Sequence, residues 1–283
     1  MKKLLIALII GITVILFGVA VFYGFKLRRG VPVQIEEVEK PLVEVPYFDR
    51  TIDFSAGIDL SFWDSIPSKG IDLIYQVMIL PWPKPWQKEV ASSVLVKAFH
   101  NREEIFFYLE WEDITEDRTV DVNTFTDASA IMFPLGEDAE PSSLMMGFLV
   151  RANIWHWKAS QDNAYWLGDT GEMKTYVDFH YPFEEEELFV VSKQEYHAAV
   201  NDLMAVRVGT VTPKPSQRVE GRGFFDGGRW KVVFSRSLDA SDREVDAQFD
   251  RKERLCAFAI WNGSKGDRGG RKSISNWVDL RIE

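Results

Sequence analysis

Two adjacent methionines are the first candidates for metal chemistry in this chain. Met145 and Met146 stand just before Gly147, in a segment that begins with Pro141 and two serines. A thioether is a soft, weak ligand that suits haem iron or copper, whereas a methionine without that role fills gaps in a hydrophobic core. The next segment, Phe148 to Lys158, is rich in strand-forming aromatic and branched residues. The pattern is compatible with one wall of a haem pocket and also with ordinary packing.

A lysine near the C-terminus is the second candidate. Lys272 stands where a loop rich in glycine and charge, Asn262 to Arg271, meets a final strand that contains Trp277. An amine binds iron only when it is deprotonated, so surrounding aromatic side chains would have to desolvate this lysine. Most lysines in such places are solvated. By itself, Lys272 therefore fits a ligand or a surface residue.

One histidine offers a rival ligand. His156 lies between Trp155 and Trp157, and the alternation of a strand places it on the face opposite both tryptophans. It is predicted either to reach a metal or to be an exposed or hydrogen-bonded strand residue. The two tryptophans share a face, where they could pack between sheets or line a porphyrin.

Composition excludes several classes of function. The formal net charge is −10 and no basic stripe is present, which argues against a nucleic-acid binder. The single cysteine, Cys256, cannot supply a C-x-x-C-H site or a cysteine-rich metal centre. No hydrolase, metalloprotease or P-loop motif occurs. The acidic runs Trp111 to Asp117 and Glu184 to Glu187 could bind calcium or a basic redox partner, but they lack EF-hand spacing and also suit solvated surfaces.

The N-terminal region predicts a membrane anchor. Leu4 to Phe25 carries no charge, and as a helix it would reach roughly 33 Å, enough to cross a hydrocarbon core of about 30 Å. A cleaved signal peptide is the alternative, but its apolar part is usually shorter and ends in small residues. We therefore expect a transmembrane anchor over residues 1–29. Residues 30–53 are polar and contain three prolines, which predicts an extended linker without a core.

The remaining chain, residues 54–283, predicts an all-β domain. Short apolar or alternating runs separated by turn residues indicate an antiparallel β-sandwich. Residues 165–217 break this pattern and are expected to form a helical or loop insertion over one face, with a possible helix over Lys193 to Met204. Phe224 to Phe234 is predicted to form a hairpin about Asp226-Gly227-Gly228. The predicted single strands are Ile71 to Leu80, Val94 to Phe99, Glu104 to Trp111, Asp127 to Pro134, Phe148 to Lys158, Leu255 to Trp261 and Ser275 to Ile282.

Several segments, taken in order, resemble a known family. They are DASAIMFP, MMG followed by NIWHWKA, WKVVFSRSL, and FAIWNGS with GGRKSISNW. This order resembles the haem-binding gamma subunit of ethylbenzene dehydrogenase and its relatives in dimethyl sulfide, selenate and chlorate metabolism. The resemblance spans roughly Trp63 to Ile282, and it is most specific in NIWHWKA and KSISNW. Members are usually exported without a retained anchor, whereas this chain is expected to be tethered.

The resemblance implies a cofactor and its ligands. It implies a β-sandwich that holds one non-covalent b-type haem, with a methionine and a lysine as iron ligands. These positions fall on Met146 and Lys272, with Met145 as an adjacent alternative. The cofactor-binding residues that it suggests in addition are Trp155, Trp157 and Ser273.

The resemblance also implies a role in a complex. The chain would be a membrane-anchored haem b electron-transfer subunit on the periplasmic or extracytoplasmic side. It would relay electrons between molybdenum-containing catalytic and iron–sulfur subunits and a quinone-linked protein or soluble cytochrome. Substrate chemistry would belong to another subunit. The alternative is a membrane-anchored, carbohydrate-binding-like β-sandwich without redox activity, because similar folds carry unrelated sites.

Overall fold

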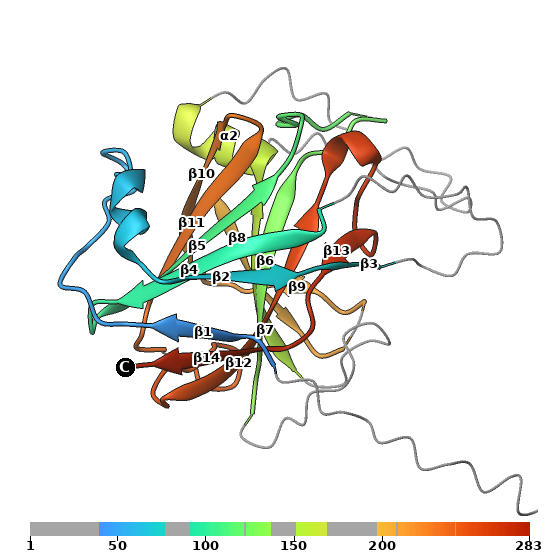
Figure 1. Ribbon diagram of the computed structural model, residues 1–283. Helices are drawn as coiled ribbons and strands as arrows, with labels where there is room; N and C mark the ends of the chain where they lie inside the picture. The colour runs from blue at the N-terminus through green and yellow to red at the C-terminus, as the bar shows by residue number, and fades with distance from the viewer. Residues whose placement is uncertain are drawn as a thin grey trace, which may run out of the picture. The chain divides into compact units, whose positions relative to one another are not determined.

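β-Strands account for most of the regular structure that a computed structural model describes. The described residues are 40–76, 91–121, 123–136, 151–168, 197–207, 209–240 and 242–283. They form two sheets that pack as layers (Figure 1). This arrangement confirms the expected β-sandwich. The two layers form because short apolar runs in the sequence bury one face or both faces of each strand.

The larger sheet has nine strands, in the order β1-β14-β12-β6-β7-β8-β9, with β13 paired to β12 and β3 paired to β13. Among the described strands, the pairings within this sheet are antiparallel except that of β1 with β14. Its strands are β1 (Leu42–Val45), β3 (Ile74–Gln76), β6 (Ala128–Pro134), β7 (Ala152–Lys158), β8 (Val200–Ala205), β9 (Thr212–Pro213), β12 (Glu253–Trp261), β13 (Lys272–Ile274) and β14 (Val278–Ile282).

The smaller sheet has five antiparallel strands in the order β10-β11-β5-β4-β2. They are β2 (Ser68–Asp72), β4 (Ser93–His100), β5 (Glu104–Glu112), β10 (Glu220–Asp226) and β11 (Arg229–Ser237). The hairpin expected around Gly227 is confirmed by the pairing of β10 with β11. The helical segments of the described part are η1 (Leu60–Ser65), α2 (Ala159–Leu167) and η2 (Gly263–Lys265).

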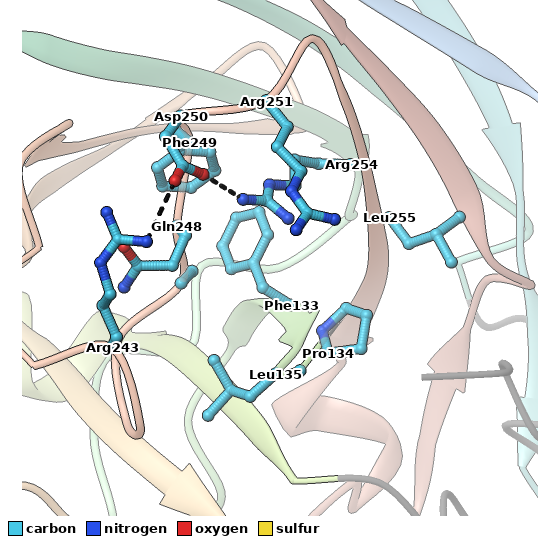
Figure 2. Close-up of a pocket in the computed structure, with 12 residues that line it drawn as sticks. Phe133, Pro134, Leu135, Arg243, Gln248, Phe249, Asp250, Arg251, Arg254 and Leu255 are labelled. Atoms are coloured by element: carbon cyan, nitrogen blue, oxygen red, sulfur yellow. Dashed lines mark hydrogen bonds and ion pairs between the residues drawn. The ribbon is translucent and has the colours of Figure 1, made fainter. Parts of the chain in front are cut away.

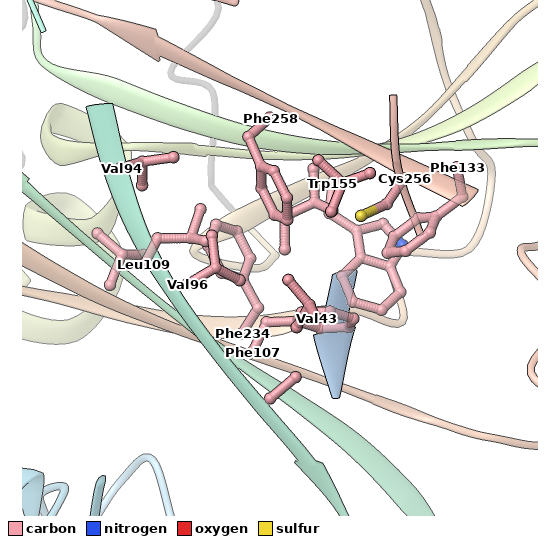
Figure 3. Close-up of a cluster of buried hydrophobic side chains, with 14 of the residues drawn as sticks. Val43, Val94, Val96, Phe107, Leu109, Phe133, Trp155, Phe234, Cys256 and Phe258 are labelled. Atoms are coloured by element: carbon pink, nitrogen blue, oxygen red, sulfur yellow. The ribbon is translucent and has the colours of Figure 1, made fainter. Parts of the chain in front are cut away.

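Aromatic side chains from the two sheets interdigitate in the core. Phe107 on β5 meets Trp155 on β7 with ring centroids 5.8 Å apart, and Trp111 meets Trp157 at 6.3 Å. Figure 3 shows Phe107, Phe133, Trp155 and other side chains of this cluster converging from both layers. Burying rings of this size removes a large apolar area from water and so stabilises the packing of the sheets.

Strand β7 has two different faces, as its alternating sequence predicts. Trp155 and Trp157 belong to the core between the sheets. Ile154 instead packs in a separate cluster on the other side of the sheet. We call that side, which is turned away from the five-stranded sheet, the outer face. Because side chains alternate along a strand, His156 and Lys158 also lie on the outer face.

The expected linker is wrong from residue 40 onward. Lys40 to Glu283 form one compact unit, and β1 pairs in parallel with β14, with Val43 opposite Leu280. Val43 and Val45 are buried in the core. The sequence LVEV alternates, so it turns two valines inward as an added edge strand, and the flanking prolines bound the strand without interrupting it.

The expected insertion is also only partly correct. Residues 200–205 form β8, which lies between β7 and β9 in the larger sheet. The helix expected over Lys193 to Met204 is therefore wrong for the residues of β8. Val200, Leu203 and Ala205 are buried there, because tertiary pairing with β7 outweighs a weak local helix preference.

The predicted anchor, Leu4 to Phe25, lies outside the described residues. Within the described part of the chain, no helix is long and apolar enough to cross a membrane.

One glycine gives a direct test of the packing between the sheets. A Cβ atom on Gly223 of β10 would lie 2.1 Å from Cζ2 of Trp157. The strand cannot easily retreat, because the Gly223 amide donates to Asp162 Oδ1 at 3.0 Å, and that oxygen also accepts from Trp157 Nε1 at 2.8 Å. We predict that Gly223→Ala lowers the free energy of unfolding by about 1–3 kcal/mol.

Denaturant unfolding monitored by tryptophan fluorescence measures this effect. Gly70→Ala on β2 is the matched control, since its added Cβ meets no atom within 4 Å. It should change stability by less than about 0.5 kcal/mol. Equal stability of the Gly223→Ala protein and the wild type would show that Trp157 is not packed as described.

Candidate haem-binding site

Lys272 lies on the outer face of the larger sheet, beside an aromatic ring. It is the first residue of β13, where it pairs with Gln76 of β3 (Figure 1). Its Nζ lies 4.8 Å from the centre of the Trp261 ring on the adjacent strand β12. Burial lowers the pKa of Lys272 to about 8. The desolvation that an iron-binding lysine requires is therefore present.

Small side chains make room for the Trp261 ring. Ala128 of β6 pairs with Trp261, and Ala130 pairs with Ala259. These residues form a buried cluster apart from the main core. The indole Nε1 of Trp261 donates a hydrogen bond to the Gly269 carbonyl at 3.0 Å, which fixes the ring. The result is a flat aromatic platform next to the Lys272 amine.

His156 reaches the same platform from β7. It pairs with Ala130 on one side and Asn201 on the other, and its ring centre lies 4.8 Å from that of Trp261. Its Nε2 is buried and has no hydrogen-bond partner among the residues that the structure describes. Burial, with smaller effects of Lys158 and Lys272, holds the pKa of His156 well below its usual value. The imidazole is therefore neutral and available as a donor or a ligand.

Lys158 completes a group of three nitrogen bases. It pairs with Ala128 and lies on the outer face, and burial lowers its pKa. For both Lys158 and Lys272 burial is the only cause of the shift, and within the described ranges neither amine has an acidic partner. Such groups are costly unless something compensates them. We call Lys158, His156 and Lys272 the nitrogen cluster. Its members can coordinate a metal when neutral or bind an anion when protonated.

The loop before Lys272 is anchored by buried carboxylates. Asp127 accepts hydrogen bonds from the Gly263 amide at 2.8 Å and from Trp230 Nε1 at 2.9 Å, and Asp113 accepts from Asn262 Nδ2 at 3.0 Å. Burial raises the pKa of Asp127 to about 7 and that of Asp113 to about 6. Through these hydrogen bonds the two carboxylates hold the loop in place. Among the described residues, no group of three or more acidic, histidine or cysteine side chains could hold a metal ion.

The structure separates some of the predicted site residues from Lys272. Trp155 and Trp157 lie on the inner face, where Trp155 Nε1 donates to Asn153 Oδ1 at 3.1 Å and Trp157 Nε1 to Asp162. Core packing accounts for both tryptophans. Ser273 also points inward, because it pairs with Ile260 of the core and is 1% exposed. None of the three shares the face of Lys272.

The predicted sulfur ligands lie outside the described residues. Met145 and Met146 fall in the range 137–150. That one of them binds the same haem iron as Lys272 therefore stays a prediction. Sequence reasoning assigned no role to Lys158 or Trp261. The alternation of NIWHWK could have placed Lys158 beside His156, but only strand register reveals that Trp261 is next to Lys272.

A cavity elsewhere on the sheet is chemically different. It lies at the opposite end of β6 and β12 and is lined by Phe133, Phe249, Arg243, Arg254 and others (Figure 2). Asp250 contacts both Arg243 and Arg254 there, so these charges are compensated. No member of the nitrogen cluster lines this cavity.

The described part of the chain is thus a β-sandwich with uncompensated nitrogen bases around a tryptophan on one outer face. A family model described as ethylbenzene dehydrogenase matches residues 61–273, and the chain belongs to this family. The match includes most of both sheets and ends one residue after Lys272.

Three relatives were compared in sequence. A protein of Haloferax mediterranei, named as a respiratory nitrate reductase haem subunit, is 29% identical over 76% of this chain and 64% of its own length. The dimethylsulfide dehydrogenase subunit gamma of Rhodovulum sulfidophilum is 27% identical over 68% and 61%, respectively. The chlorate reductase subunit gamma of Ideonella dechloratans is 24% identical over 69% and 65%. The chain therefore spans less than two thirds of the length of each relative.

The burial of Lys272 predicts a pH-dependent stability in the haem-free protein. The folded state releases the Lys272 proton near pH 8, whereas an unfolded lysine keeps it until about pH 10.4. Below pH 8 folding must desolvate a charge, so stability rises with pH between these two values. We predict that Lys272→Met stabilises the haem-free protein at pH 7 by on the order of 1–3 kcal/mol, and that this gain shrinks as the pH approaches 10.4.

Denaturant titrations of both proteins between pH 7 and 11 test this prediction. Lys69→Met, at an exposed position of β2, serves as the control and should leave stability within about 0.5 kcal/mol throughout. A gain for Lys272→Met that does not vary with pH would contradict the desolvation of the amine.

Proposed function

We propose that this chain binds one non-covalent b-type haem at the outer face and transfers electrons as a subunit of a molybdenum-type respiratory oxidoreductase complex. The observation that carries the proposal is Lys272. It is a desolvated amine without an acidic partner in the described residues, and it stands at the position that the family resemblance gives to an iron ligand. Family membership and the names of the three relatives support the same function.

The donor set of this chain fits a haem. Lys272 would provide a nitrogen ligand and Met146 the sulfur ligand, with Met145 as the adjacent alternative. When bound, the haem supplies an iron that cycles between two oxidation states one electron apart. The Trp261 platform would exclude water from the amine and keep it unprotonated. An iron held by one nitrogen and one sulfur ligand from the chain would serve electron transfer rather than substrate binding.

Met78 is a further methionine that an experiment should cover. Gln76 is the last described residue before a gap and pairs with Lys272. Met78 follows two positions later in the sequence and lies outside the described residues. A variant at this position should therefore accompany those at Met145 and Met146.

The proposed partners are those that the family resemblance implies. A molybdenum-containing catalytic subunit and an iron–sulfur subunit would lie on one side of the electron path. A soluble cytochrome or a quinone-linked protein would lie on the other. Substrate chemistry would belong to the catalytic subunit, since the proposed haem has no open position. The net charge of −10 would favour a partner with a basic docking surface.

The proposal includes a membrane anchor. Leu4 to Phe25 would cross the bilayer as a single helix, because the uncharged run is long enough to span it. The folded domain would face the periplasmic or extracytoplasmic side. That side is inferred from the family, since the basic residues before and after the apolar run are nearly balanced.

Absorption spectroscopy of the full chain, produced with haem available, tests the proposal. We predict sharp reduced-state bands of a six-coordinate haem in the wild type, and loss of these bands in Lys272→Ala and Met146→Ala, because each variant removes one iron ligand. Lys252→Ala, at an exposed position before β12, is the control and should retain the wild-type spectrum.

The outcomes separate the alternatives. Loss of the bands in Met145→Ala or Met78→Ala, with Met146→Ala unchanged, would reassign the sulfur ligand and keep the haem. A wild-type protein that binds no haem would refute the proposed function. If such a colourless protein were also retained on a polysaccharide column, the carbohydrate-binding alternative would be favoured.

A further inference from the structure

We propose that Lys158 and His156 bind the two propionate carboxylates of the haem. The proposal rests on the proposed function, because it assigns a role to residues of the same face. Lys158 and His156 would be cofactor-positioning residues, distinct from the iron ligands. Their task would be to orient the cofactor on the Trp261 platform and to compensate its negative charges.

Strand register places Lys158 and Lys272 at one level of the sheet, and His156 lies two residues from Lys158 on the same face. Trp261 is next to Lys272, Ala128 pairs with Trp261, and Lys158 pairs with Ala128. The strands run in the order β13, β12, β6 and β7. At about 4.8 Å per strand, Lys158 and Lys272 are roughly 14 Å apart at the backbone. Among the described residues, Ala128 and Trp261 stand between them in the register, so one flat ligand could reach both lysines.

Other buried cations of the described residues have partners. Lys214 forms ion pairs with Asp202 at 2.7 Å and with Asp246. Lys97 donates to the Trp63 carbonyl at 2.6 Å. Lys158 is different, because within the described ranges burial lowers its pKa without any hydrogen bond or acidic neighbour to offset the cost. An amine that no described carboxylate compensates is suited to bind an anionic group of a ligand.

His156 also carries a polar atom, its buried Nε2, without a hydrogen-bond partner among the described residues. Asn201, the cross-strand neighbour of His156, is engaged elsewhere, because its Nδ2 donates to Gln161 Oε1 at 2.7 Å. A neutral imidazole with a proton on Nε2 can donate one hydrogen bond to a carboxylate. Lys158 and His156 are two residues apart on one face of β7, which suits two carboxylates on one edge of a ligand.

The iron itself is the less suitable target for these two residues. A haem iron accepts two axial ligands, and the proposed lysine and methionine already supply them. An ammonium group at Lys158 would bind a carboxylate by a charge-assisted hydrogen bond, which is strongest where water is excluded. The nitrogen cluster therefore divides into one iron ligand, Lys272, and two anion-binding residues.

The decisive experiment compares haem with haem dimethyl ester, in which both propionates are blocked. The full chain and its variants are loaded with either cofactor, and the rate of cofactor loss to excess apomyoglobin is measured. For haem we predict that Lys158→Met and His156→Phe each release the cofactor about tenfold faster or more, since each loses a polar contact to a carboxylate. For the dimethyl ester the same variants should match the wild type.

Two further variants serve as controls. Lys252→Met, at an exposed site, should not change release of either cofactor. His156→Gln keeps a hydrogen-bond donor and should restore much of the retention that His156→Phe loses. Because Lys158 carries a positive charge near the haem, Lys158→Met should also lower the reduction potential of the bound haem and leave its six-coordinate spectrum intact.

Specific results would overturn the inference. Equal acceleration with haem and with its dimethyl ester would show that Lys158 and His156 act only on the fold. Loss of the six-coordinate spectrum in Lys158→Met or His156→Phe would make that residue an iron ligand instead. Failure of the wild type to bind either cofactor would instead refute the proposed function, so the two failures are distinguishable.

Discussion

The packing of the two β7 tryptophans between the sheets is the constraint on which the rest of the structure depends. Trp155 and Trp157 are fully buried against rings of the five-stranded sheet, and Gly223 of β10 leaves the space that Trp157 occupies. A slip of one residue in β7 would turn both tryptophans to the outer face. Because that slip would expose large apolar rings, the register is strongly fixed. The same register holds His156 and Lys158 on the outer face.

Buried charges are compensated in different ways at the two ends of the larger sheet. At the end near Asn153, Lys214 and Arg236 are enclosed by Asp202, Asp246 and backbone carbonyls, so the network is internally compensated. At the other end, carboxylates such as Asp127 are used by backbone amides of the loop that leads to Lys272. They lie on the inner side and do not reach the nitrogen cluster. These carboxylates therefore hold the loop in place, and in the described part of the chain the outer bases have no acidic partner.

Much of the fold follows from the sequence alone. Alternating and apolar runs predicted the strands around Phe107, Met132, Trp155, Val232 and Phe258, because side-chain period and burial are local properties of a strand. The same alternation correctly separated His156 from its neighbouring tryptophans. The prediction failed for β1 and β8, whose short sequences become strands only by pairing with β14 and β7. Local propensity does not contain that information.

The candidate site, like the fold, could be predicted only in part from the sequence. The sequence by itself determined that Lys272 follows a glycine-rich loop and that the chain resembles one haem-binding family. That resemblance implies Met146 as the sulfur ligand, with Met145 as the adjacent alternative. Only the tertiary structure decided that Lys272 is desolvated, that it lies over Trp261 on the same face as His156 and Lys158, and that Ser273 points inward. The physical reason is that desolvation and neighbouring charge depend on strands far apart in the sequence, and strand register, which brings them together, is set by the packing of the whole core.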